Sequence, residues 1–232
     1  MRSRTPDKVT QEYDAKWGRL LAVAEDDPTL TVEQLYYRQF HLEETYRQTR
    51  TMLRMALLPY ADQVATYIEL GCGWGLSLAQ VIDATPCHAH IGGELTEAGC
   101  RLAQRLNPTA RIVPFNFYEP TTYQFLETVK PPYVIYTHHA IEQLPSCAAF
   151  IKGLRPYHGT IHAIVHMEPL YDYCNTTPAG KRQRQYLELN HYNQDLLEQV
   201  EAQGDILRYD RNIMAANPLN PTSLLVWRFP HA

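Results

Sequence analysis

Several features are missing from this sequence, and each absence excludes a class of protein. There is no apolar run long enough to cross a membrane, and the first residues lack the apolar core of a signal peptide. Basic residues are not in excess, because 21 Lys and Arg stand against 25 Asp and Glu, which gives a formal net charge of −4. Binding to the phosphates of nucleic acid needs a positive surface. We therefore expect a cytoplasmic protein that binds neither a membrane nor nucleic acid.

Metal and disulfide patterns are missing as well. The five cysteines are scattered, odd in number and never spaced as C-x-x-C. This favours reduced thiols over disulfides or a zinc site. No H-E-x-x-H occurs, and the ten histidines are not spaced as zinc ligands. We therefore expect no metal site.

The chain does contain a regular alternation of strand-like and helix-like segments. Apolar residues recur with helical spacing in the first sixty residues, where Thr31 and Gln34 resemble a capping box and Pro59 ends the run. Apolar β-like runs then alternate with helical ones. The predicted strands are 64–70, 88–95, 110–117, 132–139, 159–167, 205–213 and 222–229, and the predicted helices among them are 75–84, 96–106, 121–129, 146–154 and 181–203.

This alternation predicts an α/β fold with a doubly wound, mostly parallel, seven-stranded sheet. Parallel strands need a crossover connection, usually a helix, and none separates the last two strands. We therefore predict that these two strands form an antiparallel hairpin at the C-terminus. We therefore predict two regions in the chain, an N-terminal helical cap or lid at 1–60 and a Rossmann-like domain at 61–232.

The stretch "YIELGCGWGLSLAQ" places Glu69 and three alternating glycines where the first strand turns into a helix. In doubly wound sheets, ligands bind beyond the carboxyl ends of the strands. Glycine permits positive φ and a close approach of the backbone to a ligand. A P-loop is excluded because no Gly-Lys-Ser/Thr follows, and a dinucleotide fingerprint needs glycine where this chain has Leu76. An ordinary glycine-rich turn is the weaker alternative.

The segment "ELGCGWG" resembles motif I of the class I S-adenosylmethionine (SAM)-dependent methyltransferases. Three further segments, "GGELTEAG", "FNFYEP" and "YVIYTHHAIEQLP", resemble the later motifs in the family's order, so that the resemblance covers 67–167. It implies that Glu69 lies near the cofactor's ammonium, that Glu94 binds the ribose hydroxyls and that Asn116, where the family often has Asp, contacts adenine. The cofactor-binding residues that it implies are Glu69, Gly71, Cys72, Gly73, Gly75, Glu94, Leu95, Asn116, Phe117 and Thr137.

Candidate catalytic residues follow the fourth and fifth predicted strands. A base is needed only if the acceptor must lose a proton, and a neutral histidine, His138 or His139, suits that role. Adjacent residues of a strand point to opposite sides, so we predict that one of the pair faces the cofactor's methyl group and that the two do not serve the same role. The alternative for each is a hydrogen-bonded histidine that supports the loop. Glu142 and Glu168 complete the predicted catalytic set.

Acceptor-binding residues are predicted on three segments. His166, Tyr171 and Asp172 lie at or after the end of the fifth strand, and Asn190 lies in the last long helix, where a solvated helix face is the alternative. Near the N-terminus, Tyr13 and Trp17 are four residues apart and share a helix face. That face either covers the site as a lid or docks the helix onto the sheet.

We therefore expect a SAM-dependent methyltransferase that acts on a small molecule, in specialised metabolism. Carboxylates and aromatic rings near the acceptor site slightly favour N-methylation of an amine or guanidine. O-methylation of a hydroxyl, on a sugar-like or other acceptor, and a non-catalytic SAM-binding subunit are the alternatives, and Leu76 disfavours a nicotinamide-dependent enzyme. Exposed aromatic residues of the N-terminal helices leave open a homodimer, although core packing explains them equally well.

Overall fold

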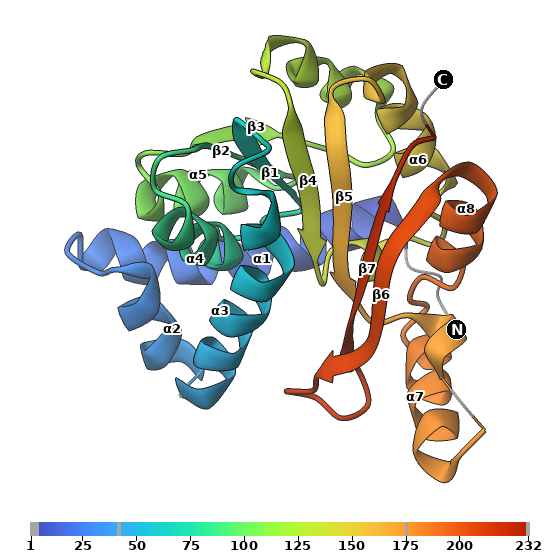
Figure 1. The fold of residues 1–232 in the computed structure, drawn as a ribbon. Helices are drawn as coiled ribbons and strands as arrows, with labels where there is room; N and C mark the ends of the chain where they lie inside the picture. The colour runs from blue at the N-terminus through green and yellow to red at the C-terminus, as the bar shows by residue number, and fades with distance from the viewer. Residues whose placement is uncertain (1–4, 41–42, 175, 231–232) are drawn as a thin grey trace.

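The computed structural model describes residues 5–40, 43–174 and 176–230. One sheet runs through the molecule in the order β3-β2-β1-β4-β5-β7-β6 (Figure 1). β1 to β5 are parallel, whereas β7 is antiparallel to both β5 and β6, so the predicted C-terminal hairpin is confirmed. The strands are β1 (Thr66–Leu70), β2 (Ala89–Glu94), β3 (Arg111–Pro114), β4 (Tyr133–His138), β5 (Ile161–Glu168), β6 (Asp205–Met214) and β7 (Thr222–Arg228).

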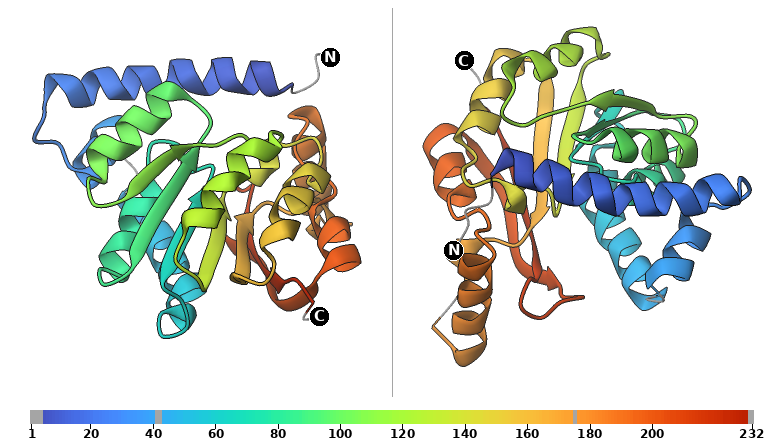
Figure 2. Two further views of the ribbon diagram at one scale, coloured as in Figure 1. Left: turned by 90° about the horizontal axis from the view of Figure 1, so that it is seen from above. Right: turned by 180° about the vertical axis from the view of Figure 1, so that it is seen from behind.

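Helices cover both faces of this sheet, as a doubly wound fold requires (Figures 1 and 2). Side chains alternate along β1, so that Ile68 packs towards α6 and α8, while Tyr67 packs towards α3. The α-helices are α1 (Pro6–Asp26), α2 (Val32–Phe40), α3 (Glu43–Leu57), α4 (Leu76–Ala84), α5 (Glu97–Leu106), α6 (Ala148–Leu154), α7 (Pro178–Leu189) and α8 (Leu196–Gln203). Short 3₁₀ turns are η1 (Leu58–Tyr60), η2 (Pro120–Thr128), η3 (Ile141–Gln143), η4 (Arg155–Tyr157) and η5 (Tyr171–Tyr173). No helix in the described ranges is long and apolar enough to span a membrane.

The N-terminal helices are packed onto the α/β region rather than held apart from it. α1 lies along α5 (Figure 2), and Leu20 and Leu21 share one apolar cluster with Trp74 and Leu102. The expected capping box is present, because Thr31 N–H donates to the Gln34 side chain (2.9 Å) and Gln34 N–H donates to Thr31 Oγ1 (3.2 Å). The division at residue 60 stays a prediction.

One predicted helix is wrong. The segment 181–203 is not continuous, because α7 ends at Leu189 and α8 begins at Leu196. His191 adopts a positive φ of 54°. The Asn193 side chain accepts from the N–H of Leu196 (2.9 Å) and donates to the Leu144 carbonyl (3.1 Å). Asn193 thus ties the start of α8 to the loop after β4.

Gly75 provides a test of how tightly the turn after β1 is packed. Its φ is +86°, and an added Cβ would overlap the Asn107 amide, which donates to the carbonyls of Gly75 (3.1 Å) and Ala103 (3.0 Å). We expect Gly75→Ala to lower the free energy of unfolding by roughly 2–4 kcal/mol, through backbone strain and overpacking. Gly159→Ala is the control, because nothing lies within 4 Å of a Cβ there. Urea denaturation measures both, and equal stability of the two variants would contradict the packing.

Candidate functional site

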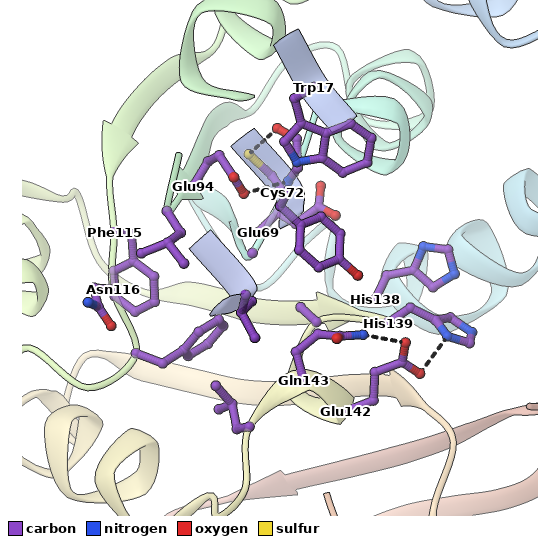
Figure 3. Close-up of a pocket in the computed structure, with 18 of the residues that line it drawn as sticks. Trp17, Glu69, Cys72, Glu94, Phe115, Asn116, His138, His139, Glu142 and Gln143 are labelled. Carbon is purple, nitrogen blue, oxygen red and sulfur yellow. Dashed lines mark hydrogen bonds and ion pairs between the residues drawn. The ribbon is translucent and has the colours of Figure 1, made fainter. Parts of the chain in front are cut away.

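A cavity of about 410 Å³ opens at the carboxyl ends of β1, β2 and β4 (Figure 3). This is the edge where doubly wound sheets bind ligands, and the volume is in the range of small-molecule sites. Its walls come from α1, from the turn after β1, and from the segments that follow β2, β3 and β4. The predicted residues that line it are Tyr13, Trp17, Glu69, Gly71, Cys72, Gly73, Glu94, Leu95, Asn116, Phe117, His138, His139 and Glu142.

The turn after β1 forms the floor of the cavity. Gly71, Gly73 and Gly75 have φ values of +78°, +54° and +86°, a region that other residues rarely adopt. A Cβ on Gly71 would lie 2.5 Å from the Ala140 Cβ, and one on Gly73 would lie 3.0 Å from the Trp17 ring. Gly71 and Gly73 therefore keep the floor free of side chains, whereas Gly75 packs against α5, outside the cavity.

Two buried carboxylates flank this turn. Glu69 accepts a hydrogen bond from the Tyr136 hydroxyl (3.2 Å), and burial raises its pKa well above the usual value. Glu94 accepts from Gly73 N–H (3.0 Å) and from the N–H and hydroxyl of Thr96 (3.1 and 2.8 Å). Burial raises the Glu94 pKa, although these hydrogen bonds oppose the shift. Glu94 thus fixes the glycine turn to the end of β2.

His138 and His139 both line the cavity, although adjacent residues of an extended strand point to opposite sides. The reason is backbone geometry, because β4 ends at His138 and His139 has a φ of +51°, outside the extended region. His138 Nδ1 lies 2.7 Å from Ser77 Oγ. Burial, and then the charge of His139, lower the His138 pKa to about 3, so this ring is neutral near pH 7.

His139 has the opposite electrostatic environment. Its Nδ1 lies 3.0 Å from Glu142 Oε2 (Figure 3). Its Nε2 lies 2.7 Å from Thr222 Oγ1. Asn220 Nδ2 and Gln143 Nε2 also donate to the Glu142 carboxylate (3.0 and 2.7 Å). Burial lowers the His139 pKa, but Glu142 and Glu168 outweigh it, and the net shift is upward. Glu142 therefore favours the imidazolium form of His139.

The N-terminal half of α1 covers the cavity. Tyr13 and Trp17 both line it, with ring centroids 5.6 Å apart, and Lys16 Nζ lies 4.6 Å from the Trp17 ring centroid. Further along the same helix, Leu20 and Leu21 are buried in the core. The lid and docking alternatives are therefore not exclusive, because the first part of α1 covers the site and the second part anchors the helix.

Four buried polar atoms on cavity-lining residues have no hydrogen-bond partner within the part of the chain that the structure describes. Nearly all buried polar groups in folded proteins are hydrogen-bonded, so each exception needs an explanation. The atoms are Trp17 Nε1, Tyr118 Oη, His138 Nε2 and Gln143 Oε1.

Besides Gly75, six predicted residues lie outside the cavity. His166 bonds Thr137 (2.8 Å) and Trp227 (3.0 Å) through its two ring nitrogens, which places Thr137 there as well. Glu168 accepts from the N–H groups of residues 140–142 and shapes η3. The other three residues lie near α7. Tyr171 donates to Glu188 of that helix, and Asp172 beside it is exposed. Asn190 follows the last residue of α7 and donates to the Tyr186 carbonyl.

Sequence reasoning missed Lys16, Ser77, Tyr118, Gln143 and Tyr192 as lining residues. Ser77 is the second residue of α4, immediately after the glycine turn, so its place in the motif was a usable signal. Gln143 lies in the same post-strand segment as Glu142. Lys16 is three residues after Tyr13 and so shares the helix face of the predicted pair, which was a usable signal as well.

Comparison with known proteins supports the fold. No family model matches the chain, and no curated protein matches its sequence. Among solved structures, magnesium protoporphyrin IX methyltransferase from Synechocystis PCC 6803, with bound SAH, matches with a TM-score of 0.61 at 10% identity, over 97% of this chain and 100% of that one.

Two other solved structures extend the comparison. Geranyl diphosphate C-methyltransferase from Streptomyces coelicolor A3(2) matches with a TM-score of 0.56 at 10% identity, over 99% of this chain and 100% of that one. The mitomycin 7-O-methyltransferase MmcR matches with a TM-score of 0.55 at 14% identity, over 97% and 69%. The chain therefore has the fold of SAM-dependent methyltransferases, as its sequence motifs predict.

The His139–Glu142 pair should make the stability of the protein depend on pH. The pKa of His139 is higher in the folded than in the unfolded protein, so its protonation stabilises the fold. This contribution is fully present below the unfolded pKa of histidine and is lost as the pH rises through the folded pKa. We expect His139→Asn, which tolerates positive φ, to cost about 1.5–3 kcal/mol at low pH and less at high pH. Urea unfolding from pH 5.5 to 9 measures this. His158→Asn is the exposed control, with a change of about 0.5 kcal/mol or less at every pH. A pH-independent cost at His139 would contradict an imidazolium there.

Proposed function

We propose that this protein is a SAM-dependent methyltransferase that acts on a small-molecule acceptor. The observation that carries the proposal is the cavity itself. It joins a positive-φ glycine floor, two buried strand-end carboxylates and four buried polar atoms without a partner in the described chain. The fold of the compared structures, in which SAH is bound in the Synechocystis and Streptomyces enzymes, supports the same assignment.

The residues of the cavity fit the proposed cofactor. Glu94 would bind the ribose hydroxyls, because its oxygens retain lone pairs beside the bonds to Gly73 and Thr96. Glu69 would face the cationic methionine part, and the cofactor's charge would favour the ionised carboxylate there. Asn116 uses its Oδ1 to accept from Tyr118 N–H (3.0 Å), which leaves its Nδ2 as the group to bond adenine. When bound, the cofactor supplies an electrophilic methyl group on a sulfonium.

For the acceptor we propose a nitrogen of an amine or guanidine, in specialised metabolism. Aromatic rings of Tyr13, Trp17 and Tyr118 and the Gln143 carbonyl surround the cavity, and such groups bind a nitrogen cation well. Methylation of a hydroxyl is the second candidate, and the neutral ring of His138 favours it, because a hydroxyl must lose its proton. The mitomycin enzyme, by its name an O-methyltransferase, is consistent with specialised metabolism.

Glu94 provides a direct test of cofactor binding. We expect Glu94→Gln to weaken SAH binding about 10- to 100-fold, because a hydrogen bond to a charged group contributes about 1.5–3 kcal/mol. Glu97→Gln, an exposed carboxylate in the first turn of α5, is the matched control. Isothermal titration calorimetry measures both, and thermal melting confirms that both variants fold. If the two variants bind SAH equally well, Glu94 does not hold the cofactor.

Catalysis is tested by supplying the purified protein with methyl-labelled SAM and an extract of small molecules from its host. We expect a labelled product, and its mass-spectrometric fragments would distinguish a nitrogen from an oxygen acceptor. SAH binding without any labelled product, across extracts from several growth conditions, would favour a non-catalytic SAM-binding subunit. No binding of SAM or SAH would overturn the proposal.

A further inference from the structure

The sheet has two edge strands, and they differ in how open they are to pairing. β3 at one edge has four residues and ends at Pro114, and a short strand and a proline both hinder pairing at a sheet edge. β6 at the other edge has ten residues without proline or lysine, and no other strand of the described chain pairs with its outer side (Figure 1). The outer side of β6 is therefore a template for a further strand.

Large apolar and aromatic side chains are exposed along this same strand. Leu207, Tyr209 and Ile213 have exposed fractions of 46%, 44% and 42%. The other large hydrophobic residues that are exposed in the described ranges are scattered over α2, α3, α7 and the loop before β7. α3 and α8 pack on the two faces near β6 but leave these side chains uncovered. A partner strand at this edge would therefore bury apolar surface as well as pair the backbone.

The charges of β6 are arranged symmetrically about Tyr209. Arg208 and Asp210 lie on either side of it, with opposite charges, and because they are two residues apart they share one face of the sheet. Within the chain they form an exposed ion pair, with Arg208 Nη2 2.6 Å from Asp210 Oδ2. The register with β7 shifts before Arg208 and after Asp210. Tyr209 is therefore the centre of a regular stretch of strand.

This pattern is complementary to a second copy of itself in the antiparallel sense. With a two-fold axis at Tyr209, that ring lies opposite the partner's Tyr209. Arg208 then lies opposite the partner's Asp210, and Asp210 lies opposite the partner's Arg208. Opposite charges directly across a strand pair stabilise it, and like charges destabilise it. An axis moved by one residue, to Arg208 or to Asp210, would place like charges opposite each other, so the charges select the axis at Tyr209.

We propose that β6 pairs antiparallel with β6 of a second copy of this chain, across a two-fold axis at Tyr209, so that the two seven-stranded sheets form one continuous sheet. Stable complexes bury about 1,200–2,000 Å² in total, and one strand from each copy supplies less, so the dimer is reversible. The inference goes beyond the proposed function, because β5 and β7 lie between β6 and the strands that border the cavity.

Sedimentation velocity on the full chain, from about 1 μM to 1 mM, tests the dimer over the Kd range of weak complexes. Arg208→Asp and Asp210→Arg each place like charges across the axis and should weaken association about tenfold or more, whereas the two substitutions together should restore it to within about threefold. Arg47→Asp, in the exposed pair with Glu43 on α3, is the matched control and should change nothing. A monomer at every concentration, a dimer that the β6 variants leave unchanged, or a double variant that does not recover would overturn the proposal.

Disulfide cross-linking tests the position of the axis. Directly opposite residues of antiparallel strands are close enough for a disulfide, so the Tyr209→Cys variant should link to its own copy on mild oxidation. The exposed native thiol is removed with Cys87→Ser. Ile213→Cys in the same background is the control, because residue 213 is exposed on the same strand but does not meet its own copy. Non-reducing gels should show a covalent dimer of the Tyr209→Cys variant, formed at least about tenfold faster than that of the control. Equal rates would overturn the axis at Tyr209.

Discussion

The turn after β1 is the constraint on which the rest of the site depends. Three residues at positive φ reverse the chain within a few residues, so that a strand and a helix meet with an open space beyond the strand. Only glycine adopts this geometry at low cost. The turn also positions its neighbours, because Gly73 N–H bonds Glu94, Trp17 packs over Gly73, and Ser77 follows in the first turn of α4. The open floor of the cavity, the place of Trp17 and the bond from Ser77 to His138 all follow from one backbone conformation.

The adjacent histidines, His138 and His139, have the same side chain but different environments. A carboxylate beside His139 favours its charged form, whereas burial without a carboxylate partner keeps His138 neutral. Their backbones differ as well, since one residue ends a strand and the other has left the extended region. A neutral ring and a ring whose charged form is favoured are therefore adjacent in the chain. The charged ring also lowers the pKa of the neutral one, so the two rings are coupled.

Helix α1 contributes to the core and to the wall of the cavity with different parts of its length. Its buried residues Leu20, Leu21 and Ala24 join the core, and Tyr13 and Lys16, one to two turns earlier, line the cavity. Such a division gives a cover whose position is set by packing. It also means that truncating the helix would remove core and cover together, so substitutions at single cavity-lining residues are better probes of the cover than deletions.

The sequence by itself determined the order of the elements, the reversed last strand, the glycine turn and the place of Glu69 and Glu94, because each follows from periodicity or from local backbone requirements. It did not determine that 181–203 breaks into two helices, because that break depends on Asn193 bonding a loop fifty residues earlier. Nor could it separate the residues near β5 that reach the cavity from those that do not. His166 and Glu168 are polar strand-end residues, yet Trp227 and the backbone of η3 occupy them. Only the tertiary structure decided which buried polar groups have a partner among the described residues and which, such as His138 Nε2, have none, because such partners come from segments far apart in the sequence.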